Sequence, residues 1–390
     1  MADKTLKELR QEIREVDSEL VHLLAKRLRL VRKIGSLKQE LNMPIIDSVT
    51  EKAVVENYVK SASEAGIDRG FDKRIANLII DASVELQTSM RSIGSAELSA
   101  ANVSVIGAGG MGSWFARFFK SRGSNVTVSD HDQHKARLLA SRIRVACASS
   151  NVEAVRGSDI VILATPANVA SNVVHEILPA LKENTLLIDI SAVKSSVMPA
   201  LRIAEKRGVQ VASIHPLFGP LGSGLREKNV IIIKRGRDKR GFRTVEHMLE
   251  SAHILLTSPK DHDRLTALTL ALPHFLNMAF AMTISKGNLA RIKKFAGRTF
   301  NLQMLLAEIV ANEPETTTDI QVMNKEFRVI LRDLQQNIRL LAVTVNRQDR
   351  ARLLARYQQI RERLSSDPEF ALAGETFERV SQAASTYSKT

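Results

Sequence analysis

The stretch VSVIGAGGMGSWFARFF, residues 103–119, determines how the central part of this 390-residue chain folds. It begins with a short apolar run typical of a buried strand and ends in an apolar segment typical of a helix. The glycines between them follow GxGxxG spacing, which lets a tight turn bring backbone N–H groups close to a pyrophosphate at a helix N-terminus. The sequence therefore predicts a strand–turn–helix unit that binds a dinucleotide. The expected contacts are Gly107, Gly109, Gly110, Met111 and Gly112.

A carboxylate downstream of this loop indicates which dinucleotide is preferred. The next apolar run, NVTVS, is followed by Asp130, about 20 residues after the glycines, where a carboxylate accepts hydrogen bonds from ribose hydroxyls. A 2′-phosphate would be repelled there, so we expect NAD rather than NADP. The nearby basic side chains of His131, His134 and Lys135 could relax that preference. Thr165, after a further strand, is also expected to contact the cofactor.

The pattern of apolar residues changes twice along the chain, from helical to alternating strand and helix and back to helical, which predicts three domains. VSVI, VTVS, IVILA, LLIDI, VQVASI and VIIIK alternate with helical segments, a pattern typical of a parallel sheet with crossover helices. The flanking parts are helical in pattern, and the small polar segment 94–100 is interpreted as a linker. We predict an all-α domain (1–92), a Rossmann-type α/β domain (101–259) and an all-α C-terminal domain (260–390). The first of these should contain helices over about 48–63 and 71–90 after a long initial helix.

Composition narrows the class of protein further. The formal net charge of +14 favours anionic partners, but only 4% of residues are aromatic and no basic run is interleaved with them, which disfavours binding to single-stranded nucleic acid. The single cysteine, Cys147, excludes an intramolecular disulfide framework and fits a reducing compartment. No signal peptide or membrane-length apolar stretch stands out, and no histidine or cysteine spacing suits a metal. We expect a cytoplasmic protein without metal, membrane or nucleic acid.

The initial helix has an apolar seam with one exception. Steps of three and four from Leu6 to Leu41 meet apolar residues everywhere except at Arg27. Such a seam is typical of a long helix whose stripe is buried against other helices. A guanidinium on it costs free energy unless it pairs with an acid, reaches water, or meets a bound anion.

Two further cations on this helix favour the bound anion. Lys38 lies about 16 Å along the axis from Arg27 and on the same face, so both could grip a small dianion between them. Arg10 lies about 25 Å from Arg27 on the other side and could reach that ligand only from a second copy of the chain. The seam and the cations together predict a helical homodimer with polycationic pockets.

Two histidines are candidate functional residues, and the position of the first suits a dehydrogenase. His215, in VASIHPLFGP, is expected just past a strand at the carboxyl edge of the sheet, where ligands bind in open α/β folds. A histidine there can take a proton from a substrate hydroxyl while hydride leaves the same carbon for a nicotinamide. A structural role is the alternative. His274, in LALPHFLNMAF, would by itself be interpreted as a core histidine.

These motifs together resemble two enzyme families. LRQEI, LLAKR, GSLK, PIIDSVTE and IIDASVELQ are similar to the all-helical chorismate mutases, whereas GAGGMG, DISAVK and IHPLFGP are similar to the prephenate dehydrogenases. Their order matches the bifunctional chorismate mutase/prephenate dehydrogenases of tyrosine biosynthesis. The resemblance implies rearrangement of chorismate to prephenate, followed by NAD-dependent oxidative decarboxylation to 4-hydroxyphenylpyruvate. The final helices resemble the family's dimerisation region.

The resemblance to the mutases also implies roles for individual residues. Arg27 and Arg10 of the partner subunit would bind the substrate carboxylates, and Lys38 and Gln87 would hold the breaking ether oxygen. One position departs from the family, because Thr50 stands where some members carry another substrate-contacting arginine. The remaining pocket residues would be Asp47, Glu51 and Ser83.

The resemblance to the dehydrogenases assigns the second site. His215 would bind the ring hydroxyl during hydride transfer, and His274 would belong to the substrate pocket. Ala192 replaces an expected serine, which leaves Ser191 as the candidate. For the arginine that clamps a substrate carboxylate the best candidate is Arg298, although an ungapped match places Phe300 there.

Two alternatives to the bifunctional enzyme remain. The chain could be a dehydrogenase whose N-terminal helices only dimerise it, although such an arm has no use for Lys38, Glu51 and Gln87. The charge of +14 could instead belong to a cofactor-sensing regulator that binds nucleic acid, although no recognition helix is recognisable. The sequence does not decide between prephenate and its amino analogue arogenate.

Overall fold

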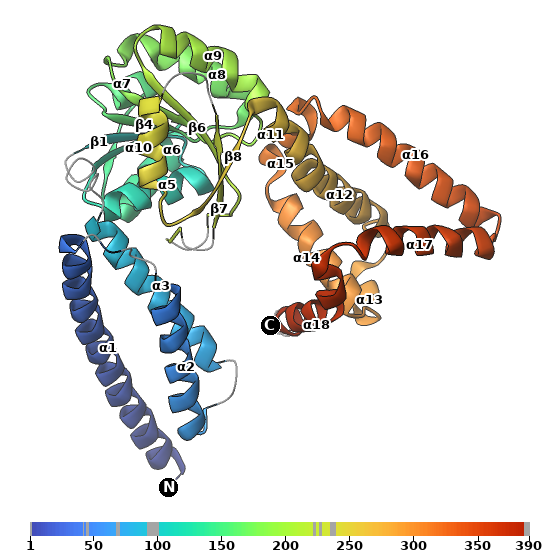
Figure 1. Ribbon diagram of the computed structural model, residues 1–390, viewed down its shortest axis with the longest axis horizontal. Coiled ribbons are helices and arrows are strands. Elements are labelled where there is room, and N and C mark those ends of the chain that lie inside the picture. Colours follow the sequence, from blue (N-terminus) through green and yellow to red (C-terminus); the bar gives the residue numbers. More distant parts are fainter. Residues whose placement is uncertain are drawn as a thin grey trace. The chain divides into compact units, whose positions relative to one another are not determined.

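The computed structural model places the chain in two compact units (Figure 1). One unit comprises Met1–Thr165, His175–Ile190 and Ile203–Leu256, and the other comprises Pro166–Val174, Ser191–Arg202 and Thr257–Thr390. The predicted linker 94–100 and residues 44–46 of the PIIDSVTE stretch lie outside the described residues, and the predicted domain limits stay a prediction. The structure describes residues 2–41, 43, 47–67, 71–91, 101–220, 224–225, 228–234 and 239–385.

Three helices form the N-terminal part, as the sequence predicts: α1 (Ala2–Glu40), α2 (Ser48–Glu64) and α3 (Phe71–Arg91). Both α1 and α2 pack against α3. On α1, the buried face carries Val31 and Gly35, between the half-buried Arg27 and Lys38.

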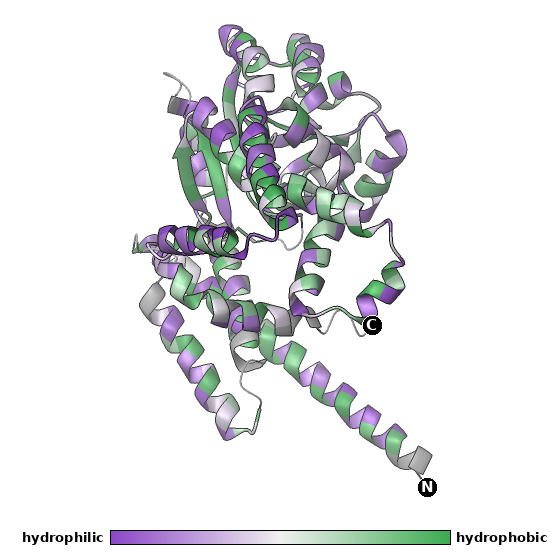
Figure 2. Ribbon diagram, turned by 90° about the vertical axis from the view of Figure 1, so that its right-hand side faces the viewer, coloured by the Kyte–Doolittle hydropathy of each residue, from purple (hydrophilic) through white to green (hydrophobic). Residues whose placement is uncertain are grey.

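The apolar residues of the α1 seam lie next to this contact rather than within it, whereas Arg27 belongs to both. The apolar members of the seam, from Leu6 to Leu41, are 46–61% exposed, and Figure 2 shows the recurring apolar bands along the helix. The prediction that the seam is buried against other helices is therefore wrong for one copy of the chain. The physical reason is that α3 packs beside Val31 and Gly35 and leaves the seam uncovered.

An eight-stranded sheet forms the centre of the α/β part, in the order β3-β2-β1-β4-β5-β6-β7-β8. Strands β1 to β6 pair in parallel, but β7 runs antiparallel to β6, so the expectation of a wholly parallel sheet is wrong there. Strands β3 and β8 have no counterpart among the predicted runs, because β3 has only two residues and β8 is largely exposed. The bounds are β1 (Asn102–Ile106), β2 (Asn125–Ser129), β3 (Ala146–Cys147), β4 (Ile160–Leu163), β5 (Leu186–Asp189), β6 (Gln210–Pro216), β7 (Asn229–Ile233) and β8 (His253–Thr257).

The strand order reverses between β1 and β4, and ligands of open α/β sheets bind at the carboxyl ends of strands at such a point. Helix α5 packs on β1, β2 and β4, while α6 packs on β2 and α10 on β6. Trp114, Phe115 and Phe119 of α5 are almost completely buried against this sheet. The helix bounds are α5 (Gly110–Ser121), α6 (Gln133–Ile143), α7 (Asn151–Val155), α8 (Ala167–Ile177), α9 (Lys194–Lys206) and α10 (Lys239–Met248).

The C-terminal part is helical, and its described residues after Thr257 include no strand, as predicted. Ala267, Ala271, Ile320 and Phe327 form its buried core. The helices are α11 (Pro259–Thr266), the π-helical turn η2 (Ala267–Ala271), α12 (Leu272–Ile284), α13 (Leu289–Lys294), α14 (Arg298–Asn312), α15 (Pro314–Met323), α16 (Phe327–Asn346), α17 (Arg350–Leu364), η3 (Pro368–Leu372) and α18 (Ala373–Ser385).

One run in this part, Pro259–Ile284, is long and apolar enough to cross a membrane by length and composition alone. The sequence was not expected to contain such a run, because charged residues in α11 and Pro273 in α12 interrupt its apolar stretches. Only 17% of its most apolar window is buried within the chain. Helix α12 packs on α14, and η2 packs on α15 and α16, so the run is also a helix of a multi-helix domain.

Candidate active sites

The first candidate site surrounds Arg27 on α1. Its Nη1 donates hydrogen bonds to Ser83 Oγ at 2.5 Å and to the Ile79 carbonyl oxygen at 3.4 Å, both on α3. These acceptors are neutral, and no carboxylate pairs with Arg27 among the described residues. The charge is therefore half-buried and held in place, but not neutralised, which is how a protein prepares a site for an anion.

Other predicted residues of the mutase site also lie on helices α1, α2 and α3. Ser83 and Gln87, one turn apart on α3, are 7% and 8% exposed. The Gln87 Oε1 atom is buried and has no hydrogen-bond partner in the part of the chain that the structure describes. Buried polar atoms rarely stay unpartnered unless a ligand or water reaches them. The structure places Lys38 near the end of α1, and Glu51 in the first turn of α2, both half-buried.

Two predicted residues of this site have other surroundings. Asp47 caps α2, because its carboxylate accepts from the Thr50 backbone N–H at 3.1 Å and from Thr50 Oγ1 at 2.7 Å. Thr50, at the position where some family members carry arginine, thus supports this cap. Arg10 is exposed on α1 and lies about 25 Å along the helix from Arg27, so the structure does not bring the two together within one chain.

The second candidate site begins at the glycine loop between β1 and α5. Gly107 has a φ of 106°, and a Cβ added there would lie 2.3 Å from the Ala164 carbonyl oxygen. A Cβ on Gly112 would lie 1.8 Å from the Gly107 carbonyl oxygen. Gly109 is different: it precedes α5 without a side-chain cap, and no atom of the described residues lies within 4 Å of its would-be Cβ. Two glycines thus close the turn, and the third leaves room for a phosphate at the helix N-terminus.

Polar groups at the neighbouring strand ends fit the rest of a dinucleotide. Asp130, directly after β2, accepts from the Ala108 backbone N–H at 2.6 Å, which ties this carboxylate to the glycine loop. Its other oxygen accepts from the Asp132 N–H at 2.8 Å and lies 2.9 Å from His131 Nδ1. After β4, Thr165 Oγ1 is buried and has no hydrogen-bond partner among the described residues. A carboxylate and an unpartnered hydroxyl beside an open loop suit a nucleotide's hydroxyl and phosphate groups.

His215 lies within the last two residues of β6, slightly earlier than predicted, and is 6% exposed. Antiparallel pairing with Ile231 of β7 holds its backbone. The chain that follows is pinned as well, because the Leu217 N–H donates to the Asn229 carbonyl oxygen at 2.9 Å. His215 therefore stands at the carboxyl edge of the sheet on a supported strand end.

The remaining predicted residues belong to the other unit. Ser191 is 6% exposed and donates to the Val193 carbonyl oxygen at 3.2 Å. His274, on α12, is half-buried, and no described residue makes a hydrogen bond with its Nδ1. Burial lowers the pKa of His274, and the Glu313 carboxylate opposes that shift without reversing it, so the imidazole is neutral near pH 7. Arg298 is more than half exposed and forms an ion pair with Glu378 of α18.

A residue that sequence analysis missed holds the Ser191 segment. Asp263 of α11 is 3% exposed and accepts from the backbone N–H groups of Lys194 and Ser195, both at 2.9 Å, and from His262 Nδ1 at 2.8 Å. It therefore caps the N-terminus of α9, although it lies 69 residues after Lys194 in the sequence. No local pattern could reveal such a cap.

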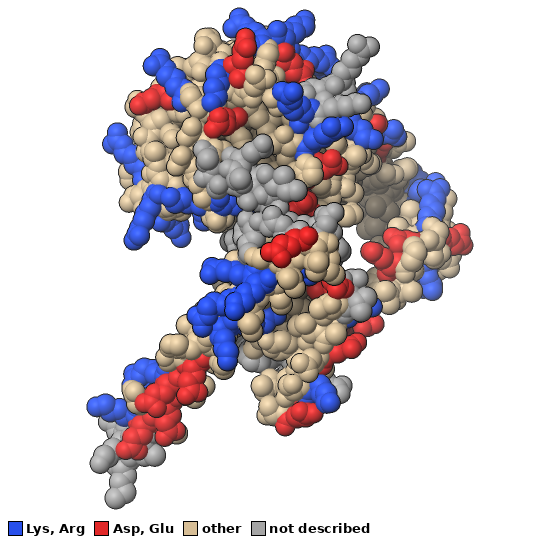
Figure 3. Space-filling model, turned by 60° about the vertical axis from the view of Figure 1, so that its left-hand side comes forward, with Lys and Arg blue, Asp and Glu red and all other residues tan. Residues whose placement is uncertain are grey.

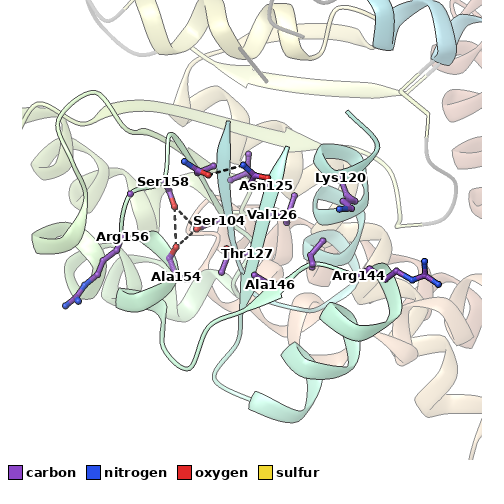
Figure 4. Close-up of a pocket in the computed structure, with 14 residues that line it drawn as sticks. Ser104, Lys120, Asn125, Val126, Thr127, Arg144, Ala146, Ala154, Arg156 and Ser158 are labelled. Carbon is purple, nitrogen blue, oxygen red and sulfur yellow. Dashed lines mark hydrogen bonds between the residues drawn. The ribbon is translucent and has the colours of Figure 1, made fainter. Parts of the chain in front are cut away.

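A cavity of about 550 Å³ lies at the opposite edge of the sheet, at the amino ends of β1, β2 and β3 (Figure 4). Its polar floor is already satisfied, since Ser104 Oγ bonds to the Ala154 carbonyl oxygen at 2.5 Å and lies 2.7 Å from Ser158 Oγ. In Figure 4 the side chains of Arg144 and Arg156 extend away from these hydroxyls on either side. Among the described lining residues, no buried polar side-chain atom is left without a hydrogen-bond partner.

These features define a class of protein: a helical domain prepared for a small anion, joined to a Rossmann-type dehydrogenase and a helical C-terminal domain. Sequence models of known families agree, with chorismate mutase type II over residues 9–88, the prephenate dehydrogenase nucleotide-binding domain over 115–233 and the prephenate dehydrogenase dimerization domain over 258–359. The chain belongs to the bifunctional chorismate mutase/prephenate dehydrogenases. The resemblance stated from the motifs and the predicted fold class are thereby confirmed.

Individual relatives are consistent with this family. The T-protein of Haemophilus influenzae is 25% identical over 367 residues, which cover 92% of each chain. A probable arogenate/prephenate dehydrogenase of Methanocaldococcus jannaschii is 30% identical over 256 residues, 64% of this chain and 57% of that one. The fold resembles that of A. aeolicus prephenate dehydrogenase in complex with hydroxyphenyl propionate and NAD+, with a TM-score of 0.57, 20% identity, and coverage of 68% of this chain and 98% of that one.

The loop glycines should differ in what their substitution disturbs. Gly109→Ala meets no neighbour and should leave folding unchanged, but it should weaken dinucleotide binding about tenfold or more by filling the approach to the phosphates. Gly112→Ala places a methyl group against backbone and should lower the melting temperature. Calorimetric titration with NAD and thermal unfolding measure the two effects. Equal loss of stability in both variants would contradict this division.

Asp263 should stabilise the protein down to acid pH. Burial alone would raise the pKa of its carboxyl, but hydrogen bonds from His262 and from the N–H groups of Lys194 and Ser195 outweigh it, so the pKa lies below its ordinary value. A lowered folded-state pKa contributes stability above about pH 4, the unfolded-state value, and loses it as the pH falls through the folded-state value. Asp263→Asn should therefore lower the melting temperature by a constant amount from pH 8 to 5.

The matched control for this cap is Asp349→Asn, because Asp349 caps the exposed start of α17 by accepting from the Arg352 N–H at 3.0 Å. Its effect on the melting temperature should be smaller, since an exposed cap can be replaced by water. A difference between wild type and Asp263→Asn that already vanishes near pH 6 would show that the carboxyl pKa is raised instead.

Proposed function

We propose that this chain rearranges chorismate to prephenate in its helical domain and then oxidises and decarboxylates prephenate to 4-hydroxyphenylpyruvate with NAD, in the cytoplasm. The observation that carries the first half is Arg27, a half-buried cation whose hydrogen-bond acceptors are both neutral. A purely structural arm would gain nothing from an unneutralised guanidinium between helices.

In the mutase reaction, the chain would bind the substrate and stabilise charge in the transition state. The rearrangement needs the folded conformer of the substrate to be held and the negative charge that develops on the ether oxygen to be stabilised. Arg27 and Arg10 of the partner subunit would hold the two carboxylates, and Lys38 and Gln87 would donate to the ether oxygen. Ser83 fixes Arg27 through the 2.5 Å hydrogen bond.

In the dehydrogenase, His215 would accept a hydrogen bond or the proton from the ring hydroxyl of prephenate. NAD+ bound at the glycine loop would accept the hydride from the carbon that carries this hydroxyl. Loss of CO₂ makes the ring aromatic, and a proton taken by His215 would then return to the ring oxygen, so the product is a phenol and no net proton is released. Neutral His274 would hydrogen-bond the substrate through its unpartnered Nδ1. Ser191 and Arg298 remain candidates for the substrate's polar groups, and Arg298 would have to exchange Glu378 for a carboxylate of the substrate.

We also propose that the chain works as a homodimer in which two α1 helices pair antiparallel. Pairing would bury the exposed apolar seam of each α1 helix. The distribution of charged residues along α1 favours the antiparallel direction (Figure 3). A twofold axis near His22 would place Arg10 of the partner subunit beside about residue 34, between Arg27 and Lys38. It would also set the acidic half of each helix against the basic half of the other, that is, Glu8, Glu12, Glu15, Asp17 and Glu19 against Lys26, Arg29, Arg32 and Lys33.

The two activities should be separable in one preparation. Arg27→Ala should reduce the mutase rate by roughly 100-fold or more, because a preorganised donor to the substrate is lost, and should leave the dehydrogenase unchanged. His215→Asn should do the reverse. The assay follows chorismate absorbance first and then NADH formation after NAD is added. If wild type consumes added prephenate but not chorismate, the N-terminal helices are only a dimerisation arm.

Mixed dimers test the shared mutase site. Arg10→Ala and Lys38→Ala chains should each be inactive as mutases, but after unfolding and refolding together about half of the dimers should be mixed and carry one intact site, giving about a quarter of the wild-type rate. Refolded Arg10→Ala chains mixed with Arg27→Ala chains should recover similarly. No recovery, with dimers confirmed by light scattering, would mean that Arg10 acts within its own chain or not at all.

A further inference from the structure

The segment that follows His215 rests on the dinucleotide helix α5 at three points. The Phe218 ring lies against the Trp114 indole with ring centroids 5.1 Å apart. Arg117 Nη2 donates to the Pro220 carbonyl oxygen at 3.4 Å. Pro220 itself packs at the first residue of the helix, where a Cβ added to Gly110 would lie 3.0 Å from its ring.

Trp114 is held by stacking rather than by a hydrogen bond. It is 1% exposed and its indole N–H is buried without an acceptor among the described residues. Its neighbours are the rings of Phe115 and Phe118 on the same helix and Phe218 from the His215 segment. Because no hydrogen bond orients the indole, the Phe218 contact is the one ring contact through which this segment sets its position.

Lys228 strengthens the same contact from the other side. Its Nζ lies 4.5 Å from the centroid of the Phe218 ring and 5.6 Å from that of Trp114, within the range of cation–π attraction. Lys228 immediately precedes β7, the strand that pairs with His215. The contact between Phe218 and Trp114 therefore joins α5 to the paired strands β6 and β7.

We propose that Phe218 is a positioning residue of the dehydrogenase, and that its contact with Trp114 couples the placement of His215 to the placement of the dinucleotide loop. A cofactor bound at the N-terminus of α5 restricts that helix, and the Phe218 contact passes the restriction to the strand end that carries His215. Each ligand then raises the affinity for the other, as linkage requires. This inference rests on the proposed role of His215.

The chain offers a direct probe, because Trp114 is its single tryptophan. Its fluorescence reports on this contact without activity, and NADH bound nearby quenches it. The test variant is Phe218→Leu, which keeps an apolar side chain but removes the ring. The matched control is Phe119→Leu, a completely buried ring of the same helix that contacts Phe118 rather than the His215 segment.

In nucleotide-free protein, Phe218→Leu should shift Trp114 emission to longer wavelength and increase its quenching by acrylamide. In wild type, 4-hydroxyphenylpyruvate should tighten NADH binding roughly fivefold or more, and in Phe218→Leu this enhancement should disappear. The dehydrogenase kcat/KM for prephenate should fall roughly tenfold or more, because small displacements of a reacting group are costly. The control should retain the enhancement.

Thermal unfolding of the same samples checks that the variants are folded. The proposal is overturned if wild type shows no mutual enhancement, or if Phe218→Leu and Phe119→Leu lose it equally. His215→Asn separates the two levels of inference. Should that variant remain fully active, the proposed role of His215 fails, whereas the Trp114 emission and NADH measurements still decide whether Phe218 joins the segment to α5.

Discussion

The close approach of Gly112 to the Gly107 carbonyl oxygen is the constraint on which the dehydrogenase part depends. A Cβ would lie 1.8 Å from that oxygen, so the turn can close only because no side chain is present. Closing it seats α5 against β1 and β4 and leaves the helix N-terminus open at Gly109. Asp130 is joined to the same turn through the Ala108 N–H, and the His215 segment rests on the same helix through Phe218.

The buried Asp263 and the half-buried Arg27 illustrate how a protein separates structure from ligand binding. Asp263 is surrounded by donors from His262, Lys194 and Ser195, so its charge is satisfied internally and serves to hold the start of α9. Among the described residues, Arg27 donates to Ser83 and to a carbonyl oxygen, which hold it in place without neutralising it. The hydrogen bonds to Asp263 stabilise the fold. The charge of Arg27 can still be stabilised by a bound anion.

Much of the architecture followed from local pattern. The three N-terminal helices, six of the strands and the helical C-terminal part are where periodicity predicted them, because apolar spacing reports which face of an element is buried. The predicted direction of β7 was wrong, because apolar periodicity does not indicate whether a strand runs parallel or antiparallel to its neighbour. The prediction that the α1 seam is buried was also wrong within one chain, because apolar spacing predicts a buried stripe but does not say which helix covers it.

The sequence by itself determined the glycine loop, the carboxylate after β2, the exceptional Arg27 and the pairing of two enzyme domains, because each depends on residue types at short, fixed spacing. Only the tertiary structure decided that Arg27 meets Ser83, that Asp263 caps α9, that Arg298 pairs with Glu378, and that Phe218 lies on Trp114. These contacts join residues that are 56 to 104 positions apart or lie in different helices. Their free energy depends on which distant surfaces are buried together, and no local spacing encodes that.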